Sequence, residues 1–468
     1  MQVSTTDIAP FLEDSSGYRG SADQVLLPAT VDEVREIVKQ ASTHDIPITV
    51  AGAGTGLTGA RVPQGGWVIS LDRFRDIEIQ RGRVRCGCGV ILADLQSAAA
   101  KTRQFFGPNP TESLACVGGI ISTNAGGARS FRFGPVGRQV LALEVTFMDG
   151  RTVRFKRGEK VDFPYRTVRT TSTTKTAAGY PLRADLDWVD LLSGSEGTLG
   201  IITEAELQLL PEPPAMLSGV VFFPSEDLAL DAVDVWRRIP RLRLLESMDA
   251  RALDFLRPKY PDTSPQAKAA LMIEQDLDSE EDPEIDLWFG RLAAQSALEE
   301  QSWFGLTAAD RERFREFRHA LPAMTVDQGR RSGGKFSTDF AVPLAKNREM
   351  YNYYRLRCEE TFPGRYTIFG HVGDANVHVN LLPRDAEEAK RADPLMEDFA
   401  RKVLSLGGTV AAEHGIGKQK TNLLKLMFSP DEIDAMKAVK DHLDPKWLLG
   451  QGTIFELEDP KRYNVSLT

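Results

Sequence analysis

Three glycine-rich stretches in the N-terminal half constrain the fold more than any other feature of this sequence. They read VAGAGTGLTGARVPQGG from Val50, GGIISTNAGGARSFRFG from Gly118 and GSEGTLGIITEAELQLLP from Gly194. The first follows a strand-like apolar segment, but Pro63 and the glycines after it break the helix that a Rossmann loop requires. One such stretch alone is more often a plain turn, although backbone N–H groups in glycine-rich turns can cradle phosphates. Three in one domain, each beside Ser, Thr or Asn, favour a long polyphosphate cofactor wrapped by backbone.

Length and charge narrow the class of protein. A chain of 468 residues is too long for one compact core, so we expect at least two domains. With 42% hydrophobic residues, the chain has enough apolar side chains to fill their cores. The net charge of -9 argues against nucleic-acid binding, which needs a basic surface. We find no apolar run long enough to span a bilayer, no secretory signal, and neither a disulfide framework nor an iron–sulfur motif among the four cysteines. We therefore expect a cytoplasmic enzyme that acts on a small molecule.

The apolar and turn patterns predict an α+β chain. The prolines of LLPEPPA, residues 209–215, stop any regular element and mark a boundary. After this boundary, predicted strands alternate with helices, one of them over residues 308–321, and from about Ala386 the chain is mostly helical. Residues 156–181 are rich in Lys, Arg and Thr without periodicity. We expect a solvated loop there, with a partner-docking loop as the alternative.

A second unusual stretch is GHVGDANVHVN, residues 370–380, in a chain with only 6 histidines. If its second half is a strand, Asn376, His378 and Asn380 share one face. The glycine-containing turn before them can fold His371 back beside that face. Two imidazoles and two amides suit a metal ion or an anionic substrate, and a polar hairpin face in solvent is the alternative.

In their order and spacing, the three glycine-rich stretches resemble the FAD-binding domain of the vanillyl-alcohol oxidase and para-cresol methylhydroxylase (PCMH) superfamily. The resemblance is to the branch that holds D-lactate dehydrogenase, the glycolate oxidase FAD subunit and D-2-hydroxyglutarate dehydrogenase, and LLSGSEGTLGIITEAEL is its most diagnostic segment. It implies non-covalently bound FAD, because the first loop lacks the histidine that anchors flavin in some members. The residues implied for FAD binding are Gly52, Gly54, Thr55, Gly56, Leu57, Gly59, Gly119, Thr123, Asn124, Gly126, Glu196, Gly200 and Ile201.

The resemblance also implies an architecture in three parts. Residues 1–212 would form a PCMH-type FAD-binding domain of two subdomains. Residues 213–410 would form an α+β substrate (cap) domain with an antiparallel sheet and the metal site, and residues 411–468 a helical segment that returns to the FAD domain.

In this branch a motif like GHVGDANVHVN supplies two metal-ligating histidines, and a later EHGIG supplies a glutamate ligand and a histidine base. The resemblance therefore implies His371, His378 and Glu413 as ligands of a divalent metal, with His414 as the base. Zinc is favoured, and manganese and iron(II) are compatible with the same donors. Two imidazoles and one carboxylate leave positions open for a substrate whose hydroxyl the ion acidifies. Two adjacent residues can serve one site only from an irregular backbone, which the glycines of EHGIG permit.

Two further segments, RFREFRHALP and GGKFSTDFAVP, resemble those that place an arginine and a lysine near the substrate in this family. They imply Arg315 and Lys335 as carboxylate-binding residues, and Asn380 is implied as another substrate contact. On a helix Arg315 and His319 are four residues apart and share a face, so we include His319 among the substrate contacts. The other arginines of this helix are interpreted as surface charges.

We therefore predict an FAD- and metal-dependent dehydrogenase that oxidises a D-2-hydroxy acid of the lactate, glycolate or 2-hydroxyglutarate class to the 2-oxo acid. Hydride would pass to flavin N5, and the acceptor would be a quinone, an electron-transfer flavoprotein, a cytochrome or an iron–sulfur partner subunit. A homodimer, and peripheral attachment to a membrane through a partner, are compatible with the sequence. The alternatives are a metal-dependent hydrolase, a noncatalytic flavin subunit of a glycolate-oxidase-like complex, and an ether-lipid synthase of the same superfamily.

Overall fold

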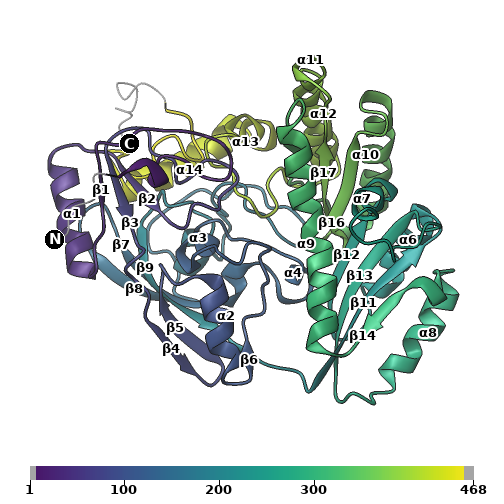
Figure 1. Ribbon diagram of the computed structural model, residues 1–468. Helices are drawn as coiled ribbons and strands as arrows, with labels where there is room; N and C mark the ends of the chain where they lie inside the picture. The colour runs from purple at the N-terminus through teal and green to yellow at the C-terminus, as the bar shows by residue number, and fades with distance from the viewer. Residues whose placement is uncertain (1–6, 458–468) are drawn as a thin grey trace.

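The N-terminal half of the chain is built from small sheets that carry the glycine-rich loops. The computed structural model describes residues 7–457, and Figure 1 shows this half in purple to blue. A parallel sheet has the strand order β1-β3-β2, an antiparallel sheet has the order β4-β5-β9-β7-β8, and β6 pairs with β10. The strands are β1 (Gln24–Leu26), β2 (Ile48–Ala51), β3 (Trp67–Ser70), β4 (Ile77–Gln80), β5 (Arg83–Gly87), β6 (Gln104–Phe105), β7 (Val140–Thr146), β8 (Thr152–Lys156), β9 (Ile201–Gln208) and β10 (Leu210–Pro211). The helices are η1 (Ala9–Phe11), α1 (Val31–Thr43), α2 (Leu92–Ala100), α3 (Val117–Ser122), α4 (Ser130–Phe133), η2 (Val136–Gln139) and α5 (Trp188–Leu192).

Local sequence accounts for several of these elements. The Thr30 hydroxyl accepts a hydrogen bond from the Glu33 N–H at 3.2 Å and caps the N-terminus of α1. A hairpin that turns at Asp149-Gly150 joins β7 to β8, and Gly150 there has a φ of 81°. The buried face of α1 consists of Val34, Ile37, Val38 and Ala41, which recur at helical spacing.

The other half is an antiparallel sheet packed against helices, drawn in teal and green in Figure 1. Its strand order is β14-β11-β13-β12-β16-β17-β15. The strands are β11 (Ala215–Phe223), β12 (Leu242–Met248), β13 (Ala269–Leu277), β14 (Trp303–Gly305), β15 (Phe336–Ser337), β16 (Tyr366–His371) and β17 (Asn376–Leu381). The helices are α6 (Glu226–Trp236), α7 (Ala250–Leu256), α8 (Glu284–Ala294), η3 (Glu299–Gln301), α9 (Ala308–Arg330), η4 (Leu344–Lys346), α10 (Asn347–Thr361), η5 (Val372–Asp374), α11 (Ala386–Ala389) and α12 (Ala392–Ser405).

Helix α9 is longer than the sequence predicted. We expected it to end before Pro322, because a proline inside a helix removes the hydrogen bond to the carbonyl four residues earlier, here that of Arg318. The helix nevertheless continues to Arg330. Tertiary packing overrides the local signal, because buried residues lie on both sides of the proline. The extra turns add Val326 and Gly329 to the wall of a cavity between the two halves.

The C-terminal segment returns to the N-terminal half. Its helices, α13 (Thr421–Met427) and α14 (Pro430–Leu443), are drawn in yellow above the purple strands in Figure 1. The Ile48 N–H donates to the Leu448 carbonyl at 2.7 Å, and the Gly450 N–H donates to the Ile48 carbonyl at 2.8 Å, which ties this segment to the edge of β2. The arrangement agrees with the α+β architecture expected from the sequence. The domain boundaries at residues 212 and 410 stay a prediction.

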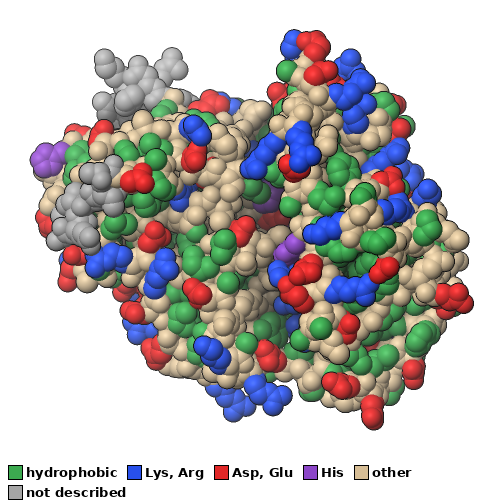
Figure 2. Space-filling model, viewed as in Figure 1, with side chains coloured by type: hydrophobic (Ala, Val, Ile, Leu, Met, Phe, Trp, Pro, Cys, Tyr) green, Lys and Arg blue, Asp and Glu red, His purple; other side chains and the backbone are tan. Residues whose placement is uncertain are grey.

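A hollow lies between the two halves. Figure 2 shows histidine and charged side chains gathered in and around it. Its wall combines Ser15 and Leu57 from the N-terminal half with Arg318 and His378 from the sheet half. Among residues 7–457, every helix is too short or too polar to cross a lipid bilayer.

Candidate active site

The first glycine-rich loop presents a row of backbone N–H groups without acceptors. Gly54, Thr55, Gly56, Leu57 and Thr58 line an elongated pocket in the N-terminal half. Their N–H groups form no hydrogen bond to any backbone carbonyl of residues 7–457. Consecutive free amides of this kind form the concavity in which proteins hold phosphate groups. The loop therefore fits the pyrophosphate of a dinucleotide.

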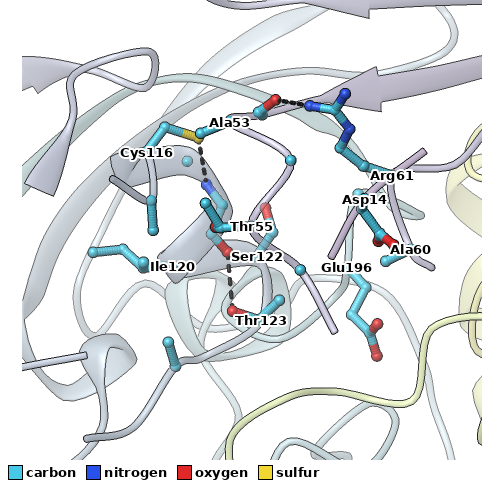
Figure 3. Close-up of a pocket in the computed structure, with 18 of the residues that line it drawn as sticks. Asp14, Ala53, Thr55, Ala60, Arg61, Cys116, Ile120, Ser122, Thr123 and Glu196 are labelled. Atoms are coloured by element: carbon cyan, nitrogen blue, oxygen red, sulfur yellow. Dashed lines mark hydrogen bonds between the residues drawn. The ribbon is translucent and has the colours of Figure 1, made fainter. Parts of the chain in front are cut away.

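At two glycines of this pocket there is no room for a side chain. A Cβ atom on Gly52 would lie 2.6 Å from the Sγ of Cys116, and one on Gly126 would lie 2.6 Å from the Oε2 of Glu413. Figure 3 shows the polar side chain of Thr55 among the residues at this wall. The predicted FAD-binding residues that line the pocket are Gly52, Gly54, Thr55, Gly56, Leu57, Gly119, Thr123, Gly126, Glu196 and Gly200.

Three predicted FAD contacts lie outside the pocket wall. The N–H of Gly59 donates to the carboxylate of Asp14 at 3.1 Å. Asn124 is engaged elsewhere, because its Oδ1 accepts from the Gly137 N–H at 2.9 Å. Ile201 is fully buried in β9, and Ile202 lines the pocket instead, since neighbouring residues of a strand point to opposite faces.

Glu196 connects this pocket to the C-terminal segment. Its buried carboxylate accepts hydrogen bonds from the N–H groups of Ile416 and Gly417, both at 2.7 Å. In Figure 3 its side chain points toward the yellow ribbon of that segment. Burial raises the pKa of Glu196 to about 7, against the lowering effect of the two N–H groups. Glu196 therefore holds the backbone that follows Glu413 and His414.

Three imidazoles converge on one oxygen of Glu413. Its Oε1 lies 3.1 Å from the Nε2 of His371 and 3.2 Å from the Nε2 of His378. The Nε2 of His414 lies 3.7 Å from the same oxygen. His371 ends β16 and His378 lies on β17, and the hairpin brings their rings to 5.5 Å, as expected from the sequence. Although burial raises the pKa of Glu413, the charges of His371 and Lys175 hold it well below its ordinary value.

The other ring nitrogen of each of the two strand histidines faces a protein oxygen. His371 Nδ1 lies 2.5 Å from the Oε1 of Glu246, and His378 Nδ1 lies 2.9 Å from the carbonyl oxygen of Thr338. A proton on each Nδ1 would leave the two Nε2 atoms, which face Glu413 Oε1, as the ligand atoms for an ion bound there. Metal-ligating histidines are oriented in this way, so the donor set fits a divalent ion.

His414 lies between the pocket of the first loop and the cavity between the halves, and it lines both. Its Nδ1 lies 3.6 Å from the Oδ2 of Asp339, which also accepts a hydrogen bond from the His414 N–H at 2.9 Å. Burial lowers the pKa of His414 to about 4, so its ring is neutral at neutral pH. A neutral imidazole with Nδ1 turned to a carboxylate can accept a proton at Nε2.

A second set of donors overlaps the first. Asp339, His378, Glu413 and His414 each offer a ligand atom, and these atoms lie within 4.8 Å of one another. Asp339 is already engaged, because its carboxylate accepts from two backbone N–H groups and pairs with Lys420 at 3.0 Å.

The structure corrects the predicted register of the substrate arginine. The Arg315 side chain is 54% exposed on α9, pairs with Glu312 and does not line the cavity. Arg318 lies there instead, buried, with its Nε 2.6 Å from the Oε2 of Glu246. At about 100° per residue, side chains three positions apart on a helix point about 60° apart. This rotation separates Arg315 at the exposed rim of the cavity from Arg318 in its interior. His319 is half-buried outside the cavity wall, and its Nδ1 lies 3.4 Å from Arg315.

The cavity between the halves has a volume of about 1250 Å³, and two of the expected substrate contacts, Lys335 and Asn380, lie in its wall. Burial lowers the pKa of Lys335 to about 8, and no charged group of the described residues offsets this effect. Asn380 Oδ1 accepts a hydrogen bond from the Ser337 hydroxyl at 3.0 Å. Lys335 is therefore a cation available to an acidic molecule in the cavity.

The two halves of the chain match known families. Residues 22–156 match the FAD binding domain, and residues 212–454 match the C-terminal domain of FAD linked oxidases. The chain belongs to the FAD-linked oxidase family. This confirms the predicted fold class and FAD as the cofactor of this oxidoreductase.

Relatives of this FAD-linked oxidase span nearly its full length. D-lactate dehydrogenase from Archaeoglobus fulgidus is 31% identical over 92% of this chain and 90% of its own. Probable mitochondrial D-lactate dehydrogenase from Danio rerio is 32% identical over 93% and 84%. Glycolate oxidase subunit GlcD from Bacillus subtilis is 29% identical over 95% and 91%. A solved alkyldihydroxyacetonephosphate synthase shares the fold, with a TM-score of 0.67 and 16% identity over 92% of this chain and 76% of its own.

One part of the site of this oxidase comes from the segment that we expected to be a solvated loop. Within residues 156–181, Arg166 is 70% exposed, in agreement with that expectation, but Lys175 has a side-chain exposure of 0%. The sequence signal was the change from charged residues and threonines to the small and aromatic residues of TAAGY after Lys175. Two further residues that no motif marked are Glu246 and Asp339, which contact His371 and His414.

Proposed function

We propose that this FAD-linked oxidase converts a D-2-hydroxy acid to the 2-oxo acid, with His371, His378 and Glu413 holding a divalent metal and His414 accepting the hydroxyl proton. The observation that carries this proposal is the group of three Nε2 atoms around one oxygen of Glu413. Glu413 and His414 line both the FAD pocket and the adjoining cavity, so a substrate there would lie between base and flavin. The names of the D-lactate dehydrogenase and glycolate oxidase relatives support the same substrate class.

The charge balance of the buried cluster supports a metal. Besides its histidines, the cluster has four carboxylates and three cations. Burial lowers the pKa of His371, but Glu413 and Glu246 raise it above its ordinary value, so a proton on His371 balances the charges while no ion is bound. A dication at Glu413 would take the place of that proton. Zinc is the ion we propose, and manganese or iron(II) would suit the same donors. The carboxylates are Glu246, Asp339, Asp374 and Glu413, and the cations are Lys175, Arg318 and Lys420.

Each side chain would have a defined task. Lys335, which pairs with no carboxylate of the described residues, would bind the substrate carboxylate, and Asn380 would contact the substrate beside it. Arg318 would keep Glu246 charged and through it fix the His371 ring. His414 would receive the hydroxyl proton at Nε2 while Asp339 faces its Nδ1. When bound, FAD supplies the hydride acceptor and the metal a Lewis acid for the hydroxyl.

An overlapping metal site made by Asp339, His378, Glu413 and His414 is the second candidate, because their ligand atoms lie close together. We favour the first set, since Asp339 is held by N–H groups and Lys420. A metal-dependent hydrolase is disfavoured, because hydrolysis needs no flavin.

Metal analysis and flavin reduction in histidine variants test this proposal. We expect His371→Ala and His378→Ala to lose metal and retain FAD, and His414→Ala to retain both but reduce its flavin at least 100-fold more slowly. His44→Ala, on the exposed end of α1, is the control and should match the wild type. Metal retained in His371→Ala but lost in His378→Ala, His414→Ala and Asp339→Asn would favour the second ligand set. Flavin reduction at the wild-type rate in His414→Ala would remove it as the base.

A further inference from the structure

Lys175 is a fully buried ammonium at the junction of three parts of the chain. It comes from the loop between β8 and α5, and its side-chain exposure is 0%. Its Nζ lies 2.8 Å from the Oε2 of Glu413 in the C-terminal segment and 3.6 Å from the Oδ2 of Asp374 in the β16–β17 turn. A buried lysine is costly unless it is paired, so this position is not an accident of surface packing.

The two oxygens of Glu413 have different partners. Oε1 faces the Nε2 atoms of His371 and His378, whereas Oε2 accepts a charge-assisted hydrogen bond from Lys175. Gly126 closes this arrangement, since a Cβ atom there would lie 2.6 Å from Oε2 and 2.9 Å from the Lys175 Nζ. Only Oε1 is therefore free to face a cation.

Asp374 holds the ammonium from the other side. It is 1% exposed, and its carboxylate oxygens accept no hydrogen bond from the described residues. Lys175 is the one cation of residues 7–457 that pairs with it. If Lys175 moved away, Asp374 would be left as an unpaired buried charge, which is strongly unfavourable. Asp374 thus keeps Lys175 against Glu413.

We infer that Lys175 is a positioning residue that limits Glu413 to one metal-ligating oxygen, so that the coordination position which the second oxygen would fill stays open for substrate. This inference rests on the proposed metal site. Carboxylates bind divalent ions through one or both oxygens, and a catalytic site must keep a position open. A 2-hydroxy acid presents a carboxylate and a hydroxyl oxygen and needs such open positions. Lys175 thereby acts on ligand binding through Glu413, without contacting the substrate.

The test separates metal binding from ligand binding. Zinc affinity is measured on chelator-stripped protein by competition with a chromophoric chelator, and oxalate, which offers two oxygens to a metal, is titrated into the zinc-loaded, FAD-bound protein. For Lys175→Met we expect zinc affinity equal to or tighter than that of the wild type, because Glu413 gains a second free oxygen. We expect oxalate to bind at least tenfold more weakly. Lys175→Arg, which keeps the charge, should restore oxalate binding to within threefold.

Two further variants distinguish the proposed role of Lys175 from a simple loss of folding or stability. Lys175→Met with Asp374→Asn removes both charges and should show the same pattern if the single variant does not fold. Lys440→Met removes another buried lysine, paired with Asp444 at 2.6 Å in α14, and should lower stability without separating zinc from oxalate binding. Parallel loss of zinc and oxalate binding in the Lys175 variants, or oxalate binding equal to that of the wild type, would overturn the inference. Failure of the wild-type protein to bind zinc would instead reject the proposed metal site on which it rests.

Discussion

At the scale of single residues, the candidate site depends on which atom of each group is already engaged. Glu246 is held by Arg318 and faces the Nδ1 of His371, and the Nε2 of His371 is turned toward Glu413. Burial raises the pKa of Glu246, but Arg318 and His371 together hold it well below its ordinary value. A substitution of Arg318 should therefore disturb the orientation of the His371 ring, although the two side chains do not pair directly.

Replacing Arg318 tests this dependence. Arg318→Met should lower the free energy of unfolding by about 3–5 kcal/mol, because it leaves the buried Glu246 without its countercharge. Arg315→Met is the matched control three residues away, and the exposure of its pair with Glu312 limits the expected change to about 0.5 kcal/mol. Urea denaturation of both variants measures the difference. Equal stability of the two variants would contradict the corrected register of α9.

Lys335 gives the site a pH dependence. Burial lowers the pKa of this lysine to about 8, so its ammonium is present below that pH and is lost as pH rises through it. If it binds the substrate carboxylate, KM should rise about tenfold between pH 7 and pH 9. Steady-state kinetics across this range provide the measurement. Lys335→Gln should show a higher KM without this rise, and the same pH profile in the variant would exclude Lys335 as the binding cation.

At the scale of elements, an irregular segment turns two adjacent side chains toward one site, which neither a helix nor a strand could do. Glu413 and His414 are adjacent, yet both face the same site. Gly415 and Gly417 make this possible with φ angles of 78° and 54°, in the left-handed region that favours glycine. Glu196 then fixes the segment from the side of the FAD pocket.

Substitution of Gly415 should therefore damage function more than folding. A Cβ atom there would lie 2.7 Å from the Cδ of Glu196 in addition to the strain of a positive φ. We expect Gly415→Ala to slow flavin reduction at least tenfold. Gly158 also has a positive φ, 89°, but nothing lies within 4 Å of an added Cβ atom there. Gly158→Ala should therefore cost about 1 kcal/mol of stability and leave the rate of flavin reduction unchanged. Stopped-flow measurement of flavin reduction in both variants tests this prediction. Equal rates in the two variants would mean that this segment does not position the site.

The sequence predicted elements better than it predicted long-range contacts. The hairpin that joins His371 to His378 follows from residue alternation and a glycine turn within eleven residues. Arg318 was missed because neighbouring helix positions carry similar side chains, and only packing against β12 selects the buried one. Lys175 lies 238 residues from Glu413 in sequence, and no local pattern reports a contact across that separation.

At the scale of the whole molecule, the proposed metal site joins parts that are far apart in the chain. His371 and His378 belong to the seven-stranded sheet, Glu413 to the C-terminal segment and Lys175 to the N-terminal half. A ligand that binds only this assembled state stabilises the folded chain through mass action.

Metal binding should therefore be visible in global unfolding. At a zinc concentration one hundred times the dissociation constant, the free energy of unfolding of chelator-stripped protein should rise by about 2.7 kcal/mol. His378→Ala should not respond, because it lacks one ligand. Urea unfolding with and without zinc measures this, and superimposable wild-type curves would argue against a metal at this junction.

We propose that a D-2-hydroxy acid reduces the flavin of this oxidase through a metal held at Glu413. Anaerobic loss of the visible flavin absorbance tests it most directly, with D- and L-lactate, glycolate, D- and L-2-hydroxyglutarate and D- and L-malate added in turn, before and after chelator treatment. We predict rapid bleaching by glycolate or by one of the D-acids and not by its L-enantiomer, abolished by the chelator and restored by a divalent metal. If none of these acids bleaches the FAD-bound protein, or if bleaching is equally fast after complete metal removal, the proposed metal-dependent reaction is wrong.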